Sequence, residues 1–465
     1  MRRALPCFLV GVSLFVGAAC VGEDPTLTNN ETNDGAAPGP EASTAGDGAP
    51  LTDGGGSDGQ PLGDGVEGTV VDLGTTPVAN ATVRIGTVSV QTDAIGQFKI
   101  PNVKLPFEVD VVSPLDPTAD GTTKYVMSVR GLKTRTPILH VRFIGAERTA
   151  PASGTTDLTF TGNNNRLRIA FVPQVGLPTA TTSPGVRPVN PETYSETVTW
   201  QGKPTIAGFW YFLHWVEPTA TPGLPASFSG VARIAGSLTD TVAATVSPMS
   251  ALGVGQDTLA GTVTYPADAT EKTVSVGVKL SPADRVGYTF VTYRTAPGNT
   301  SLSAPVPGRA GITALVVGTA RSPNAAGAAR QTQVVVWKTN LNTRTSNVAI
   351  AFPSAPSLTT PAEGANVKAT DTFSWTGGTA PYRLDVDCIG YKASIVTMAT
   401  DAALPTGLGS WPAAATACTA AVTSYGSNVP SLESFVAADA PFKTTSPWAA
   451  DGTMATMTNA FMSAQ

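Results

Sequence analysis

Short runs of alternating apolar and polar residues, rich in β-branched side chains, recur along this chain from about residue 66 onward. Such a run places successive side chains on opposite faces of a strand, so that one face is buried and the other meets water. Turn-forming Pro, Gly, Asn and Asp separate the runs, and no stretch of helical length has a sustained apolar period of about 3.6 residues. We therefore expect an all-β fold of tandem antiparallel β-sandwiches. Clear examples of such runs are Thr82–Ile85, Leu139–Phe143, Leu167–Phe171, Thr273–Val278 and Gln333–Trp337.

The part of the chain with this pattern is too long for one hydrophobic core. Roughly 400 residues of strand-forming sequence predict two to four domains. Changes in pattern place three folded regions, at residues 66–145, 146–352 and 353–465. The middle region matches no family by its motifs.

The first nineteen residues have the layout of a secretory signal peptide. Arg2 and Arg3 are basic, the run Phe8–Val16 is apolar, and the small residues of Gly17–Ala19 precede Cys20. The apolar run is too short to span a bilayer stably, and small side chains fit a peptidase cleft. Residues 1–19 are therefore predicted to be removed on export.

Two kinds of cleavage are compatible with this boundary. The segment from Gly17 to Cys20 resembles the lipobox of bacterial lipoproteins, although the large aliphatic residue, Val16, stands four places before the cysteine rather than three. This resemblance implies that Cys20 is acylated, and Val21 after it implies sorting to the outer membrane. Gly17 and Ala19 also suit an ordinary signal peptidase, which would release a secreted protein.

Residues 20–65 are expected to form a disordered tether after the lipidated cysteine. They are mostly Gly, Asp, Pro, Thr, Ala, Asn and Ser, with no aromatic residue and nine carboxylates up to Asp64. Such a composition buries too little apolar surface to fold. Without these nine acids and the two arginines of the signal peptide, the formal net charge of −5 becomes about +2, which does not suggest binding to nucleic acid or to an anionic membrane surface.

Cysteine usage agrees with export. Cys7 leaves with the signal peptide and Cys20 is the acylation candidate, which leaves Cys388 and Cys418 in the last region. An exported domain with two cysteines usually pairs them, so we predict a disulfide here.

Residues 66–145 carry a resemblance to a known family. The runs that carry it are Gly68–Asp72, Pro77–Val83 and Thr92–Ile100. They resemble the carboxypeptidase regulatory-like domain, which implies a small transthyretin-like β-sandwich, also grouped with carbohydrate-binding-like folds. Packing gives each match a reason: Ala81, Val83 and Ile85 share one face, Asp93–Gly96 forms a tight turn, and Phe98 with Ile100 returns to the core.

Residues 353–465 resemble a fibronectin type III or immunoglobulin-like module. The resemblance rests on Thr360–Gly364, on Phe373–Trp375, which would supply the core tryptophan, and on the strand Tyr382–Val386. The tail beyond Pro447 has no interpretable pattern.

One aromatic run, Phe209–Trp215, offers the only residues that suggest a ligand. Flat rings suit the faces of sugars, so Trp210, Tyr211 and Trp215 are the candidate ligand-binding residues, with Trp200 and Trp411 as further exposed-ring candidates. The alternative, which we favour, is a strand buried on both sides where two sheets meet.

Catalytic and metal-binding motifs are missing from the sequence. The sequence has two histidines. We expect His140 to face solvent and His214 to be a core residue whose ring is hydrogen-bonded. No H-E-x-x-H, C-x-x-C, G-x-S-x-G, P-loop or dinucleotide fingerprint occurs. We therefore expect no enzyme, no cofactor and no metal.

Two functions of different class remain, with an uncharacterised enzyme as a distant third. The leading hypothesis is a non-catalytic, lipid-anchored surface protein that binds polysaccharide or another envelope protein. The alternative is an envelope scaffold that contacts other proteins. A row of exposed tryptophans would favour sugar binding, whereas an exposed apolar patch would favour a protein partner.

Overall fold

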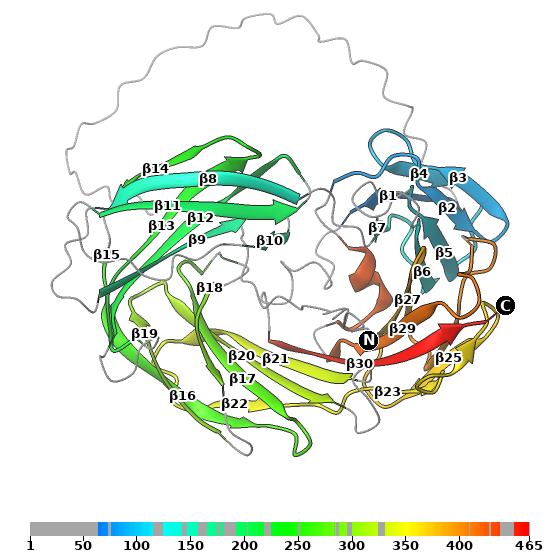
Figure 1. Ribbon diagram of the computed structural model, residues 1–465. Helices are drawn as coiled ribbons and strands as arrows, with labels where there is room; N and C mark the ends of the chain where they lie inside the picture. Colours follow the sequence, from blue (N-terminus) through cyan, green and yellow to red (C-terminus); the bar gives the residue numbers. More distant parts are fainter. Residues whose placement is uncertain are drawn as a thin grey trace, which may run out of the picture.

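The computed structural model describes residues 64–72, 76–114, 124–141, 147–156, 165–173, 177–179, 192–201, 203–217, 225–249, 252–282, 284, 288–294, 300–323, 331–408, 410–426, 429–437 and 451–464. Within these residues the protein is built almost entirely of β-strands in packed sheets (Figure 1), which confirms the all-β prediction. The signal peptide, Cys20 and nearly all of the tether lie outside the described residues.

The N-terminal region is a β-sandwich with one core. A sheet in the order β4-β1-β7 packs on strands β2, β3, β5 and β6. The bounds are β1 Val66–Val71, β2 Thr82–Ile85, β3 Val88–Gln91, β4 Gln97–Ile100, β5 Phe107–Val112, β6 Lys124–Leu132 and β7 Ile138–His140. Gly96 adopts a φ of 75° in the turn after Asp93, and Phe98 and Ile100 are buried, as the sequence predicts.

The middle region contains two cores that share a sheet. The sheet β15-β13-β12-β9 packs one face on β10-β11-β8-β14 and turns the other toward the strands that follow. The bounds are β8 Glu147–Thr156, β9 Asn165–Pro173, β10 Leu177–Thr179, β11 Glu192–Gln201, β12 Thr205–Val216, β13 Ser227–Thr239, β14 Ala244–Met249 and β15 Leu252–Gly253.

The second core of the middle region lies between two further groups of strands. The sheet β19-β16-β22 packs against β18-β17-β20-β21. The bounds are β16 Gly255–Thr264, β17 Glu271–Lys279, β18 Tyr288–Arg294, β19 Thr300–Gly308, β20 Thr313–Pro323, β21 Gln331–Asn342 and β22 Val348–Ala351.

The C-terminal region is a further sandwich. The sheet β23-β25-β28 faces β26, β27, β29 and β30, and Phe373 and Trp375 lie in the core as predicted. The bounds are β23 Ser357–Thr360, β24 Asn366–Val367, β25 Thr372–Thr376, β26 Tyr382–Cys388, β27 Tyr391–Thr397, β28 Asp401–Ala403, β29 Ala417–Ser424, the 3-10 helix η2 Leu432–Val436 and β30 Gly452–Ser463.

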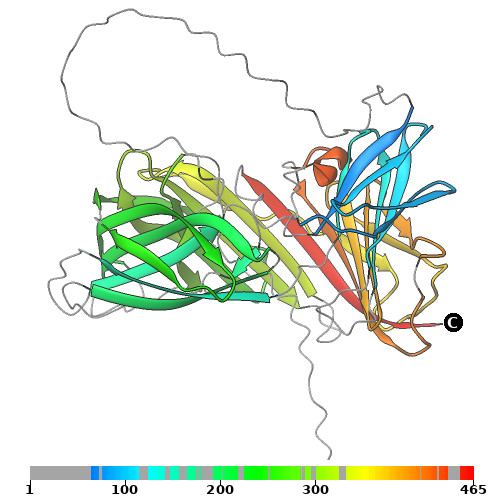
Figure 2. The ribbon, with the colours of Figure 1, turned by 90° about the horizontal axis from the view of Figure 1, so that it is seen from above.

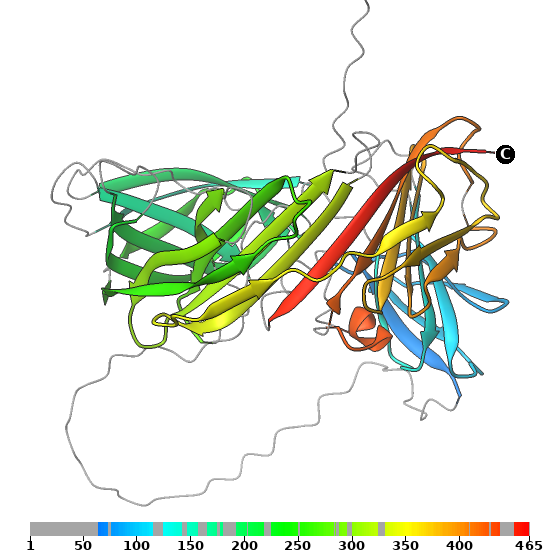
Figure 3. The same ribbon diagram turned by 90° about the horizontal axis from the view of Figure 1, so that it is seen from below.

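A thirteen-stranded sheet, as counted over the described residues, takes strands from all three regions. Its order is β18-β17-β20-β21-β30-β29-β26-β27-β6-β5-β2-β3, with β24 beside β30. The C-terminal strand β30 pairs with β21 on one edge and with β29 on the other, and it runs diagonally between the two halves of the molecule (Figures 2 and 3). The other junction, between β27 and β6, is parallel, whereas the sequence pattern predicts antiparallel pairs.

Candidate functional site

The aromatic strand β12 is buried on both faces. Trp210 is 3% exposed, Tyr211 0% and Trp215 1%. Trp210 lies in the core shared with β8 and β11, while Tyr211 and Trp215 lie in the core shared with β16–β22. No ring face of these residues is open to a sugar, so the structure corrects the ligand-platform interpretation and favours the alternative of a strand between two sheets.

Of the other tryptophans named as candidates, Trp200 is buried and Trp411 is partly buried. Trp200 is 0% exposed, and its Nε1 donates to the Lys203 carbonyl at 2.8 Å. Trp411 stacks on Phe461 with ring centroids 6.4 Å apart, and its Nε1 donates to the carbonyl of Ala464. The part of the chain that the structure describes therefore offers no row of exposed tryptophans.

Both histidines are buried. His214 is 5% exposed, its Nε2 lies 3.2 Å from Oδ1 of Asn165, and burial lowers its pKa to about 4. This agrees with a satisfied core histidine. His140 is 3% exposed, and its Nε2 lies 3.1 Å from the Ala437 carbonyl. The expectation that His140 faces solvent is wrong, because the segment containing η2 packs over the end of β7.

Cys388 and Cys418 form the expected disulfide. They stand directly opposite each other on the neighbouring strands β26 and β29, with their Cα atoms 4.4 Å apart. Both residues are buried in the C-terminal core. The bond therefore joins two strands of the large sheet within this region.

A break in strand pairing creates a notch at the end of the thirteen-stranded sheet. Strands β2 and β5 pair from Thr82 to Arg84, and Arg84 opposite Asp110 is the last pair. Beyond it β2 turns at Gly86, whose φ of 61° suits a two-residue hairpin, and leads back into β3. The β2–β3 hairpin and the first residues of β5 thus lie apart and leave an opening between them.

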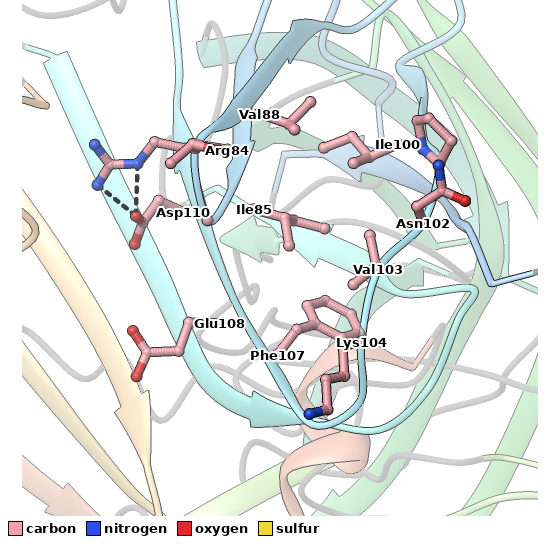
Figure 4. A pocket seen from close by; sticks show the side chains of 13 residues that line it. Arg84, Ile85, Val88, Ile100, Asn102, Val103, Lys104, Phe107, Glu108 and Asp110 are labelled. Carbon is pink, nitrogen blue, oxygen red and sulfur yellow. Dashed lines mark hydrogen bonds and ion pairs between the residues drawn. The ribbon is translucent and has the colours of Figure 1, made fainter.

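The notch is a cavity of about 550 Å³ lined by both polar and apolar groups, and the five apolar side chains at its base are here called the floor. Figure 4 shows these apolar side chains grouped on one side of the β2 and β5 backbones. They come from β2, β3, β4, β5 and the loop before β5: Ile85, Val88, Ile100, Val103 and Phe107. Val88 is 44% exposed, although its hairpin partner Ile85 is only 8% exposed, because the sandwich is open at this end.

Charged groups surround this floor. Arg84 and Asp110 form an ion pair at 2.6 Å, and Nη1 of Arg84 also donates to the Thr406 carbonyl at 2.9 Å. Lys104 and Glu108 are exposed at the same cavity (Figure 4), and neither forms an ion pair with any other described residue. An apolar floor beside one cation and one anion suits a ligand with an aliphatic or aromatic group flanked by polar or charged ones.

The strand beside the notch has a free edge. β3 is the last strand in the order of the large sheet. The Thr92 amide donates to the Ala81 carbonyl, so by the alternation of an antiparallel pair Ser89 and Gln91 turn their backbone groups away from β2. No described strand pairs with β3 on that side.

Sequence reasoning missed the notch. The residues of its floor read as ordinary core positions, and the free edge depends on where pairing stops. The one local signal lies in the two turns that frame the opening, at Gly86 and at Asn102, which has a φ of 55°. No group of three or more His, Cys, Asp and Glu residues suited to a metal occurs among the described residues.

Across the described part of the chain, no helix combines the length and apolar character that crossing a bilayer requires.

Comparison with known proteins gives little. No family model matches the chain, and no curated protein matches it. A solved structure of the Bacillus anthracis TIE protein is 10% identical with a TM-score of 0.14, covering 62% of this chain and 50% of that one. A Streptococcal ancillary pilin is 7% identical with a TM-score of 0.13, covering 62% of this chain and 99% of the pilin. The chain thus spans about half the length of the TIE protein, and both TM-scores are too low to inform its function.

Proposed function

We propose that this chain is a non-catalytic protein of the bacterial envelope that binds an extended segment of another protein at the notch between β2, β3 and β5. The proposal includes the export predicted from residues 1–19 and the lipid anchor predicted at Cys20. The single observation that carries it is an open cavity with a mixed apolar and charged lining beside a strand with a free edge.

A protein segment fits these features better than a sugar does. An extended peptide pairs its backbone with a free strand edge and places alternate side chains into a neighbouring pocket. Ser89 and Gln91 supply the backbone groups on the outer edge of β3, and Val88, which belongs to β3 and also lines the notch, contacts an apolar side chain of the segment. Lys104 and Glu108 would pair with charged side chains of the partner. Of the tryptophans that suggested sugar binding, Trp200, Trp210 and Trp215 are buried and Trp411 is partly buried.

Selection from a random peptide display library on the chain without its signal peptide and tether tests this function. Enriched peptides should bind the chain and lose about tenfold in affinity or more with Val88→Asp, because the new carboxylate would be buried against an apolar group. Ile389→Asp is the matched control, since Ile389 is 78% exposed at a distant turn. The absence of enriched peptides, or equal binding by both variants, would reject the notch as a peptide site.

The envelope scaffold is the second candidate. Its support is the continuous pairing of β21, β30 and β29, which ties the middle and C-terminal regions into one sheet. A scaffold without a ligand at the notch predicts that Val88→Asp leaves every interaction of the protein unchanged.

A further inference from the structure

A buried amine lies against a carboxamide at one end of the middle region. Lys279, the last residue of β17, is 1% exposed, and its Nζ donates to Oδ1 of Asn340 at 3.0 Å. Burial of an ammonium group is unfavourable, and it lowers the pKa of Lys279 to about 8. Roughly a tenth of such amines are neutral at pH 7, and the neutral amine is a nucleophile.

Asn340 is turned toward this lysine by an irregularity in its strand. The β20–β21 register shifts between Ala314 and Val316, and Asn340 has a φ of 56°. Lys279 stands opposite Thr313 of β20, and Thr313 stands opposite Asn342 of β21, so the contact reaches from β17 to β21 across the strand between them (Figure 1). Asn340 itself is exposed, so water can reach its carboxamide.

Fixed charges hold the surroundings in place. Asp284 is 1% exposed and accepts hydrogen bonds from Arg233 at 2.8 Å, from the Ser281 amide at 3.0 Å and from the Tyr211 hydroxyl. Its negative charge acts on Lys279 and opposes part of the effect of burial. The turn that follows β17 is thereby tied to β12 and β13, which restrains the lysine at its start. The 3.0 Å hydrogen bond holds Nζ against the carboxamide oxygen, one bond away from Cγ, and attack requires Nζ and Cγ to come within about 3–3.5 Å of each other.

We propose that Lys279 and Asn340 react with each other and form an intramolecular amide cross-link. The neutral Nζ attacks Cγ of Asn340, an Nζ–Cγ bond forms and the Cγ–Nδ2 bond breaks. The proton lost from Nζ ends on Nδ2, carried there by water at the exposed side of Asn340, and the nitrogen leaves as ammonia. No oxidant, reductant or further reactant enters the step. The product joins β17 to β21 covalently within the large sheet.

Intact-mass and peptide-mass measurements on the full exported chain test this proposal. The expected result is a protein lighter by one ammonia than its processed, disulfide-bonded sequence. After digestion, the peptides containing Lys279 and Asn340 should appear as one branched species with the same deficit. Full recovery of the two unlinked peptides from protein aged at about pH 8, where roughly half of the amines are neutral, would overturn the proposal.

Substitutions of the two residues distinguish the proposed cross-link from a loss of ammonia elsewhere in the chain. Lys279→Met and Asn340→Ala should each restore the full mass, and each should lower the midpoint of thermal unfolding, with no further fall in the double variant. Lys338→Met is the control, because Lys338 forms an exposed ion pair with Asp451 and should leave the deficit unchanged. A deficit that persists in both single variants would place the ammonia loss elsewhere and reject the cross-link. Should a variant fail to fold, the branched peptide of the unaltered chain still decides the question.

Discussion

The aromatic strand β12 and the notch beside β2 are opposite in how their apolar side chains are used. β12 has a paired strand on each edge, β9 and β13, and a core on each face, so Trp210, Tyr211 and Trp215 are at most 3% exposed. The notch has fewer and smaller apolar side chains, yet Val88 is open, because β2 and β5 stop pairing and β3 has a free edge.

This difference shows that the number of apolar residues in a segment does not decide whether their side chains are accessible to a ligand. The richest aromatic run of the sequence is used for joining two cores, and the candidate binding surface arises from valine, isoleucine and phenylalanine where pairing ends. A sugar-stacking platform therefore finds no support at β12. The comparison can be tested by substitutions that remove pairing or packing in one region and leave the other unchanged.

Removal of β30 should have the largest effect on the stability of the protein. Deletion of residues 452–465 removes the pairing partner of both β21 and β29. It also removes the buried Met457 and Phe461 and exposes the core side chains that pack on them. We expect a large fall in the midpoint of thermal unfolding, measured by circular dichroism and calorimetry, together with aggregation through the two new strand edges. Met462→Ala is a milder control on the same strand, since this residue is only partly buried. A truncated chain that unfolds like the full one would show that β30 does not join the two regions.

Trp215→Ala should be the most destabilising single substitution in the comparison. Its ring packs against Phe228 and Phe290 and is 1% exposed. We expect the free energy of unfolding to fall by about 3–5 kcal/mol, from lost contacts and a residual cavity. Val242→Ala, at a site 54% exposed, should change it by no more than about 0.5 kcal/mol. Urea unfolding measures both, and equal effects would contradict the dense packing around β12.

Acid should destabilise the aromatic strand through His214. Burial lowers its pKa to about 4 in the folded protein, whereas an unfolded chain binds the proton near 6.5. The unfolded state therefore binds more protons between these values, so this contribution to stability is complete above 6.5 and is lost as the pH falls toward 4. Urea midpoints at about pH 7.5 and about pH 4.5 should differ less in His214→Gln than in the unaltered chain. An identical pH dependence would show that His214 does not titrate in this way.

A matched pair of valines on one hairpin gives the smallest expected effect. Val83 is 0% exposed and Val88 is 44% exposed, although both lie on the β2–β3 hairpin. Val83→Ala should lower the free energy of unfolding by about 2 kcal/mol, and Val88→Ala by no more than about 0.5 kcal/mol. Chemical denaturation of both variants measures the difference. A large loss with Val88→Ala would mean that the notch is part of the packed core and not an open surface.

Much of the local structure could be predicted from the sequence. Alternation placed Ala81, Val83 and Ile85 on one buried face, and the turn ending at Gly96 returned Phe98 to the core. These features depend on residues that are close in the sequence. The alternation of side chains along a strand and the freedom of glycine to adopt a positive φ are therefore enough to predict them. Period-two alternation likewise predicted the all-β class, and cysteine usage predicted the disulfide between Cys388 and Cys418.

The tertiary structure alone decided which strands pair and where pairing stops. Nothing in the residues of β30 shows that it lies between β21 and β29, because strand pairing between distant segments depends on the whole packed arrangement. The same reason hid the notch, the cover over His140 and the contact between Lys279 and Asn340. The sequence by itself determined the all-β class, many of the strands with their buried faces, and the sulfur bridge. The meeting of strands from residues far apart in the chain determined which apolar and polar groups remain open to a partner or to each other.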